Sequence, residues 1–327
     1  MSTDPKFSAG IWAFTSAVDR FATSGYRDDF TLEQKIEMCG RVRGLDGVIL
    51  QYPAVVNDDN VDRVEQLVAD NGLEVAQVDA VIFDRPYQLG SFTNPDAAVR
   101  KKAAEEAKRT VDIAKRLGTR NVGLWLGQDG YDYLFQVDYR EIWKREVEGV
   151  RKVAEHDPTM RLCFEYKLRE PRMFLTVPNV GTALRLCQDV GMDNVGFTVD
   201  VGHCFMAREN PAEAAVHLMM AGRLFGAHFN DTYGVDDDDL IAGSVHIAHL
   251  LELLLYLDEM GYSDWYGLDY FPYREDIVRA AELSIDNVKS LREIAATIDR
   301  AKLREAQAEG SGIAVQQYIH DILYRRA

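Results

Sequence analysis

The sequence has no long apolar run and no basic leader segment. Its longest apolar stretch, near residues 250–257, is interrupted by Glu252 and is much shorter than the roughly 20 residues that cross a bilayer. The N-terminus lacks the basic and then apolar pattern of a signal peptide. Cysteine is also scarce, and no Cys-x-x-Cys pair occurs among Cys39, Cys163, Cys187 and Cys204. We therefore expect reduced core thiols in a cytoplasmic protein with no membrane partner.

Basic residues are outnumbered by acidic ones. The chain has 37 Lys and Arg against 53 Asp and Glu, which gives a formal net charge of −16 at pH 7. This charge repels a phosphate backbone and anionic lipids, so we expect no nucleic-acid partner. A divalent cation or a neutral polyol is better suited to it. The 47% hydrophobic and 28% charged residues are typical of a globular protein.

The chain does contain one alternation of strand and helix, repeated about eight times over 327 residues. A glycine follows most of the expected helices, as a helix C-terminus favours. No G-x-G-x-x-G follows the first strand, so this α/β pattern favours a closed (β/α)₈ TIM barrel over an open Rossmann sheet. The expected strands are 7–14, 47–51, 73–81, 121–126, 161–166, 194–199, 224–229 and 265–270.

We expect a catalytic barrel over residues 1–300 and a C-terminal helical extension over 301–327. Eight units do not need the extension, which has a helical apolar face and is expected to form an oligomer contact. The residues of this face are Tyr318, Ile319, Ile322, Leu323 and Tyr324.

Acidic residues and histidines occur where the last four strands end. In a barrel the carboxyl ends of the strands converge on one mouth. Three carboxylates and an imidazole gathered there need a cation to neutralise them, and oxygen-rich ligands with imidazole suit Mn²⁺, Mg²⁺ or Co²⁺. We expect a first metal site formed by Glu165, Asp200, His228 and Asp269.

A second group of ligands overlaps the first. His203 lies three residues beyond Asp200, and Asp236 and Asp238 follow His228 by eight and ten residues. Alternate residues of an extended loop project the same way, so we expect Asp236 and Asp238 to hold a second cation beside His203. A shared Asp200 would place the two cations near adjacent oxygens of one substrate.

Each of these residues has another explanation when taken alone. Residues 236–239 could form a solvated turn, His228 could be a core histidine, and Lys167 could be a surface lysine. Glu165 is harder to explain in this way, because an unpaired carboxylate in an apolar strand is costly. Their joint occurrence at four successive strand ends favours a metal site.

The motifs around these residues resemble those of the sugar isomerases in the xylose isomerase-like TIM-barrel superfamily, which includes xylose isomerase and L-rhamnose isomerase. The segment Phe164-Glu-Tyr-Lys-x-x-Glu-Pro-Arg172 is similar to the family's Glu-x-Lys strand end and its Glu-Pro-Arg loop. Asp200-Val-Gly-His203 occupies the place of the shared ligand and the following histidine. The spacing from His228 to Asp236 and Asp238 is similar to that of L-rhamnose isomerase. The resemblance extends from about Phe7 to Asp276.

This resemblance implies two divalent cations and an aldose–ketose interconversion by hydride transfer between C1 and C2 of a sugar. It implies that Lys167 stabilises charge on O1 and that Trp125 excludes water from the hydride. It assigns catalytic roles to Lys167 and Asp236. The expected substrate-binding residues are Trp12, Gln51, Trp125, Phe21, His203 and Phe271.

Two positions depart from the family pattern. Gln51 stands where xylose isomerase has its ring-opening histidine, and glutamine cannot act as a general base. Ring opening must then use another group, either a water held by a metal or Asp231. Phe271 replaces a lysine that follows the last ligand. Both departures imply a substrate other than D-xylose.

Other functions remain open. A sugar 3-epimerase or a C-glycoside-cleaving eliminase of the same superfamily would use two glutamates for proton transfer, but here the second position is Asp269. A metal-binding or sugar-binding barrel without activity would not need Lys167 beside the ligands. An abasic-site endonuclease would need more histidines and a basic surface.

The loop over residues 16–27 contains Phe21, in a segment similar to one in xylose isomerase whose phenylalanine enters the neighbouring subunit's sugar pocket. The alternative is that Phe21 folds onto its own loop. An exposed phenylalanine in a loop of this length suggests a role, so we expect a homodimer or homotetramer in which Phe21 completes the partner's site.

Overall fold

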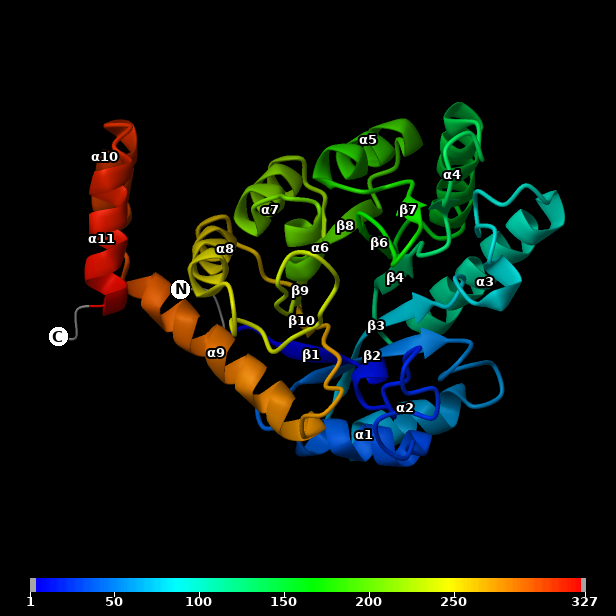
Figure 1. The fold of residues 1–327 in the computed structure, drawn as a ribbon. Coiled ribbons are helices and arrows are strands. Elements are labelled where there is room, and N and C mark those ends of the chain that lie inside the picture. The colour runs from blue at the N-terminus through cyan, green and yellow to red at the C-terminus, as the bar shows by residue number, and fades with distance from the viewer. Residues whose placement is uncertain (1–3, 325–327) are drawn as a thin grey trace.

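The computed structural model describes residues 4–324 and contains a closed barrel of eight parallel strands (Figure 1). Each strand pairs with the next one along the barrel, and β1 closes the ring by pairing with β10. The predicted (β/α)₈ barrel is therefore confirmed. The strands are β1 (Phe7–Gly10), β2 (Gly47–Tyr52), β3 (Glu74–Ala80), β4 (Asn121–Trp125), β6 (Arg161–Glu165), β8 (Val195–Asp200), β9 (Leu224–Phe229) and β10 (Tyr266–Leu268).

Helices surround the barrel and connect its strands (Figure 1). The first of them begins at a capping box, in which the Thr31 side chain accepts a hydrogen bond from the amide of Gln34 and the Gln34 side chain accepts one from the amide of Thr31. The connecting helices are α1 (Leu32–Arg41), α2 (Val61–Asp70), α3 (Ala97–Arg116), α4 (Tyr139–Ala154), α5 (Val180–Val190), α7 (Pro211–Met220), α8 (Ile247–Glu259) and α9 (Ile277–Thr297).

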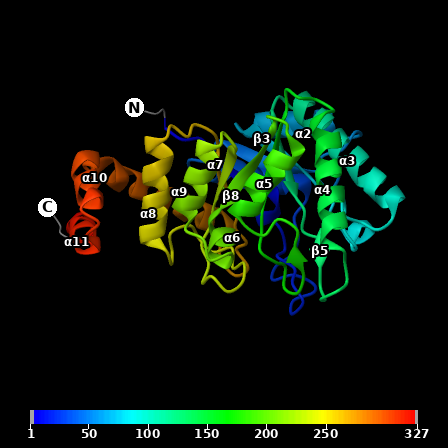
Figure 2. The ribbon, with the colours of Figure 1, turned by 90° about the horizontal axis from the view of Figure 1, so that it is seen from above.

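Short elements decorate the loops that follow the strands. The short helix α6 (Val201–Met206) continues from β8, and the pair β5 (Gly130–Tyr131) and β7 (Phe174–Leu175) joins the loops after β4 and β6. The 3₁₀ helices are η1 (Ile11–Ala13) and η2 (Arg85–Tyr87). Figure 2 shows α6 and β5 on the same side of the barrel, opposite the N-terminus. The first strand is shorter than predicted, because the chain turns into η1 after Gly10.

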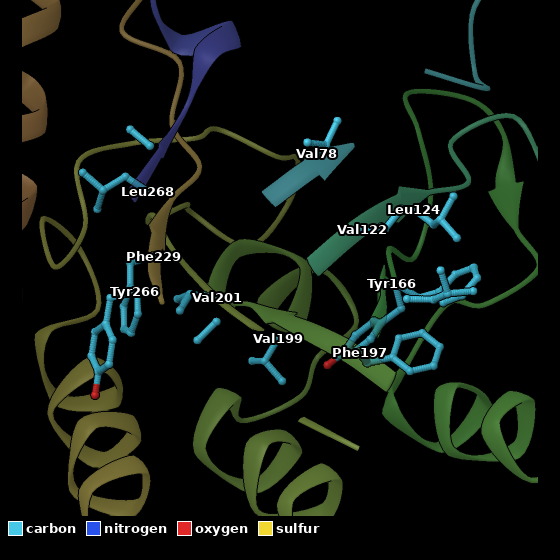
Figure 3. Close-up of a cluster of buried hydrophobic side chains, with 14 of the residues drawn as sticks. Val78, Val122, Leu124, Tyr166, Phe197, Val199, Val201, Phe229, Tyr266 and Leu268 are labelled. Carbon is cyan, nitrogen blue, oxygen red and sulfur yellow. The ribbon is translucent and has the colours of Figure 1, made fainter. Parts of the chain in front are cut away.

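Alternation along the strands separates the core from the barrel interior. Figure 3 shows Phe197 and Val199 of β8 within a cluster of buried apolar side chains. Their neighbours Thr198 and Asp200 project to the other face of the strand, because successive strand residues point in opposite directions. By the same alternation, His228 points to the opposite face of its strand from Phe229, and Asp269 points to the opposite face from Leu268. The packing that stabilises the strands thus also directs the polar residues into the barrel.

Two further helices, α10 (Arg300–Ala308) and α11 (Gly312–Tyr324), follow the barrel and confirm the predicted helical extension. They form a hairpin that projects from the end of α9 on the side of α8 (Figures 1 and 2). Tyr318, Ile319, Ile322 and Leu323 are partly buried against the core, whereas Tyr324 is exposed. Contact of this hairpin with a second subunit stays a prediction. Among residues 4–324, no helix has both the length and the apolar character needed to cross a membrane.

Candidate metal centre and substrate pocket

Four predicted ligands meet at the carboxyl ends of four neighbouring strands. Glu165 ends β6, Asp200 ends β8, His228 lies near the end of β9, and Asp269 directly follows β10. These strands are adjacent in the barrel, and Asp200 and His228 are register partners. One ligand atom from each of the four side chains lies within 4.8 Å of the others. The structure therefore brings the predicted first ligand set together.

The imidazole of His228 is at the centre of this cluster. Its Nδ1 lies 3.2 Å from a carboxylate oxygen of Glu165 and 3.4 Å from one of Asp269. Burial lowers the pKa of His228, but the nearby Glu165 and Asp269 carboxylates raise it well above its ordinary value. Gly267 makes room for the ring, because a Cβ there would lie 2.7 Å from Cδ2 of His228. The glycine at position 267 therefore allows the His228 ring to lie between the carboxylates of Glu165 and Asp269.

The donor atoms of the cluster fit a cation. His228 Nδ1 and Glu165 Oε1 are buried, and neither has a hydrogen-bond partner among the described residues. Unpaired buried polar atoms are costly, and a metal ion would satisfy both of them. Three carboxylates and one imidazole form an oxygen-rich set that suits Mn²⁺, Mg²⁺ or Co²⁺.

Asp200 is held in place from two sides. Its Oδ1 accepts a hydrogen bond of 2.8 Å from the amide of His203, and its Oδ2 accepts one of 2.8 Å from the Asn230 side chain. Asn230 is fixed in turn, because its Oδ1 accepts from the amide of Gly202. Asn230 therefore positions a carboxylate that belongs to both ligand groups, a supporting role typical of metal sites.

The second ligand group consists of Asp200, His203 and Asp237, whose ligand atoms also lie within 4.8 Å of one another. Nε2 of His203 is 3.0 Å from Asp237 Oδ2, and its buried Nδ1 makes no hydrogen bond to the described residues. Burial lowers the pKa of His203, but Asp200, Asp237 and Glu165 together raise it to about 10. This group, like the first, is arranged to receive a cation.

The expectation that Asp236 and Asp238 supply this second group is corrected. The Asp236 side chain is 70% exposed and lies 3.5 Å from Arg169. Asp238 instead caps the turn before it, since its Oδ2 accepts from Thr232 Oγ1 at 2.6 Å and from the amide of Tyr233 at 2.8 Å. These contacts direct Asp237 and Asp239 inward, one residue out of phase with the prediction. Alternate residues of this loop do face the same way, as predicted. A run of four aspartates, however, does not show which alternate pair faces the pocket.

Lys167 is buried beside the second group. Its Nζ lies 2.8 Å from Asp237 and 2.6 Å from Glu170, and it stands 5.4 Å from the centre of the Trp125 ring. Burial lowers the pKa of Lys167, but the two carboxylates outweigh this effect and raise it above its ordinary value. The site therefore contains a fixed positive charge.

A pocket of about 300 Å³ is lined by Lys167 and by four of the ligand residues, Glu165, His203, Asp237 and Asp269. The predicted residues Trp12, Gln51, Trp125 and Phe271 lie on its walls, where Phe83 packs edge-on against Trp125. The pocket also contains residues that the sequence analysis did not single out as site residues, namely Asp79, Phe83, Asp237 and Asp239. A small pocket with two aromatic walls and a polar floor suits a small polyol.

Two further predicted residues, Asp231 and Phe21, also lie outside this pocket. Asp231 is buried and fully engaged, because its carboxylate accepts from the amides of Val245 and His246 and pairs with the His246 ring at 2.8 Å. Its proposed part in ring opening is therefore corrected, since it holds the start of α8. Phe21 lies in the loop after β1 with 80% of its surface exposed. The Arg20 guanidinium of the same loop lies 4.8 Å from the centre of the Phe21 ring, and the part of Phe21 in a partner's site stays a prediction.

The fold and the site define a class: TIM barrels that gather acidic and histidine ligands at the carboxyl mouth. The family model described as "Xylose isomerase-like TIM barrel" matches residues 37–294, and the chain belongs to this family. A protein from Mesorhizobium japonicum named probable sugar isomerase is 28% identical over 312 residues, which cover 90% of this chain and 70% of that protein.

Solved structures share the fold. The structure of an L-ribulose 3-epimerase matches with a TM-score of 0.70 and 18% identity, over 94% of this chain and 99% of that one. The structure of D-psicose 3-epimerase from Clostridium cellulolyticum, with D-tagatose, has a TM-score of 0.69 and 16% identity, over 88% and 99% of the two chains. At these identities the likeness concerns the architecture.

Proposed function

We propose that this protein is a sugar-processing enzyme, and specifically a divalent-cation-dependent isomerase that interconverts an aldose and a ketose by a 1,2-hydride shift. The observation that carries this proposal is the position of Lys167. A buried ammonium group stands 2.8 Å from Asp237 of the second ligand group, in the same pocket as Glu165 and Asp269 of the first. Such a site has a place for cations and a separate fixed charge for a developing oxyanion.

The bound cations would polarise oxygens on neighbouring carbon atoms of an open-chain sugar. Lys167 is then placed to donate a hydrogen bond to O1, where negative charge develops as the carbonyl carbon receives the hydride. Glu170 and Asp237 hold the ammonium group and keep it protonated. Trp12, Trp125 and Phe83 form apolar walls that exclude water from the reacting carbons.

The comparisons support this proposal at two levels. Family membership favours a sugar substrate, and the relative from Mesorhizobium japonicum is named a probable sugar isomerase. The buried lysine favours the hydride shift, in which negative charge develops at O1, whereas epimerisation at C3 needs a pair of carboxylates to remove and return the proton.

A sugar 3-epimerase is the second candidate. Glu165 and Asp269 approach the same His228 nitrogen at 3.2 and 3.4 Å, so two carboxylates converge on one point as a proton-transfer pair would. The matched structures of 3-epimerases share this fold. Asp269 is shorter than a glutamate by one methylene and is tied to Trp12, which disfavours this reaction.

Incubation in D₂O separates the two candidates. The Mn²⁺-, Mg²⁺- or Co²⁺-loaded protein is mixed with a panel of aldoses and ketoses, and products are followed by NMR. We expect aldose–ketose interconversion without deuterium at C1 or C2. Epimers carrying deuterium at C3 would replace this proposal with the epimerase, and no conversion of any sugar would refute both.

A further inference from the structure

One carboxylate of the pocket comes from a strand that supplies no residue to the two ligand groups. Asp79 is near the end of β3 and lines the pocket. The four ligands of the first group come from β6, β8, β9 and β10, which form one half of the closed ring, whereas β3 lies in the other half, opposite β9. Asp79 therefore faces the ligand groups across the pocket mouth.

The neighbours of Asp79 hold it in a defined position. Gln77, two residues earlier on the same strand, donates a hydrogen bond of 2.8 Å to Asp79 Oδ1. On the next strand, Gly123 is the register partner of Asp79, and a Cβ at this position would lie 2.0 Å from Asp79 Oδ1. A residue without a side chain is thus needed to seat this carboxyl group. Oδ2 has no hydrogen-bond partner within residues 4–324.

Asp79 also lies beside the position where a ring-opening base is missing. Gln51 on β2 is its register partner on the other side, and both side chains line the pocket. Glutamine cannot take up a proton. Asp231 is buried under α8, bonded to three amides and the His246 ring. Neither residue can therefore serve as the base.

The other ionisable groups of the pocket have partners or lie within the acidic cluster. Glu165, Asp269, His203 and Asp237 belong to the ligand groups, and Glu170 is paired with Lys167. Asp239 follows Asp237 by two residues in the same loop and lines the same pocket, so it lies on the side of the second ligand group. Burial, with a smaller contribution from the charges of Glu165 and Asp269, raises the pKa of Asp79 to about 7, which suits a group that both accepts and returns a proton near neutral pH.

We propose that Asp79 is the acid–base residue that opens the sugar ring, on the side of the pocket opposite the cations. This inference rests on the proposed function. For an aldopyranose, the Asp79 carboxylate takes the proton from the O1 hydroxyl, and the electron pair left on O1 forms the C1=O bond. The C1–O5 bond breaks with its electrons passing to O5, which takes the proton back from Asp79. No atom is gained or lost, and the open-chain aldose remains for isomerisation.

The test uses a reaction that does not depend on isomerisation. Freshly dissolved α-D-glucopyranose or α-L-rhamnopyranose is added to the metal-loaded protein at low buffer concentration, and conversion of the α to the β anomer is followed by NMR of the anomeric protons. We expect the wild type to accelerate this exchange and Asp79→Asn to lose the acceleration by about 10²-fold. Asp84→Asn, an exposed aspartate in the loop after the same strand, is the matched control.

A sugar that cannot cyclise provides the second arm. Erythrulose has too few carbons to form a ring, so Asp79→Asn should lower the rate of its isomerisation far less than it lowers the rate of anomer exchange. Far-UV circular dichroism and Mn²⁺ titration show whether the variant is folded and binds metal. Asp79→Ala provides a further readout, because added formate should restore anomer exchange in the space left by the carboxyl group.

Three results would overturn the assignment of Asp79. The first is that the wild type fails to accelerate anomer exchange of both probes, and the second is that Asp79→Asn exchanges anomers at the wild-type rate. The third result is that Asp239→Asn loses the exchange while Asp79→Asn keeps it. Failure of the proposed function is distinguished from these, since the wild type would then isomerise neither erythrulose nor any aldose while anomer exchange still reports on Asp79.

Discussion

The indole of Trp12 donates a hydrogen bond of 2.7 Å to Oδ1 of Asp269. Trp12 lies in η1, the 3₁₀ helix that follows β1, and Asp269 directly follows β10, and these two strands pair where the barrel closes. The bond therefore links the first and last strands at the point where the last ligand enters the site. It leaves Oδ2, which faces His228, as the oxygen available to a cation.

We expect Trp12→Phe to weaken binding of Mn²⁺ by about 10-fold, because a partner that orients a metal ligand typically contributes 10- to 100-fold in affinity. Isothermal titration calorimetry measures the change. Trp143→Phe is the matched control, since Trp143 donates a similar bond of 2.8 Å to Asp189 far from the site. Equal affinities in both variants would mean that Trp12 does not position Asp269.

Replacing Lys167 should impair chemistry more than metal binding. We expect Lys167→Met to lower kcat by about 10²–10³-fold with metal content unchanged, the scale for loss of one oxyanion donor. Steady-state kinetics and metal analysis check this, with Lys144→Met on the exposed side of α4 as the control. Near-normal turnover would remove Lys167 from the mechanism and favour the epimerase.

The loop after β9 offers a matched pair of variants. Asp237→Asn should abolish binding of the second Mn²⁺, because Asp237 lies within 4.8 Å of the other ligand atoms of its group. Asp236→Asn should leave binding unchanged, because that side chain is 70% exposed. Titration of both variants with Mn²⁺ decides which aspartate is the ligand, and the opposite outcome would restore the phase expected from the sequence.

Glu146 of α4 should make stability depend on pH. It is fully buried, with one oxygen near Thr176 and the other without a hydrogen-bond partner among residues 4–324. Burial, followed by the charge of Asp129, raises its pKa well above the ordinary 4.5. The folded state then holds this proton more tightly than the unfolded state, so the free energy of unfolding falls as pH rises above about 4.5.

Glu146→Gln replaces the titrating carboxyl group with a neutral amide. We therefore expect the Tm of Glu146→Gln to exceed that of the wild type by an amount that grows between pH 5 and pH 8, measured by thermal melts. Glu148→Gln, an exposed glutamate on the same helix, is the control. A Tm difference that stays constant over this range would contradict a protonated Glu146.

Assembly is tested through Phe21. We expect a homodimer or homotetramer by light scattering, with Phe21→Ala raising KM without changing Mn²⁺ affinity, because Phe21 is 80% exposed and does not line its own pocket. Leu89→Ala, which changes a 61% exposed residue in another loop after a strand, serves as the control. A fully active monomer would show that Phe21 has no partner subunit to complete.

Local patterns in the sequence were sufficient for the fold and for the first ligand group. Strand–helix alternation predicted the barrel, because side-chain periodicity and glycine C-caps act within a few residues. Glu165, Asp200 and His228 lie at or near the ends of regular strands, and Asp269 follows one directly. The (β/α)₈ fold brings such positions to one mouth. Counting along the strands therefore placed these residues correctly.

The remaining site residues depended on contacts between distant segments. Which of the four aspartates at 236–239 face inward was decided by hydrogen bonds from Thr232 and Tyr233 to Asp238. Asp231 lies outside the pocket because its carboxylate pairs with the ring of His246. Asp79 became a pocket residue because Gly123, on the neighbouring strand, leaves space for its carboxyl group. Sequence spacing predicts the direction of a side chain only within a regular element, whereas a loop takes its direction from partners that tertiary packing brings to it.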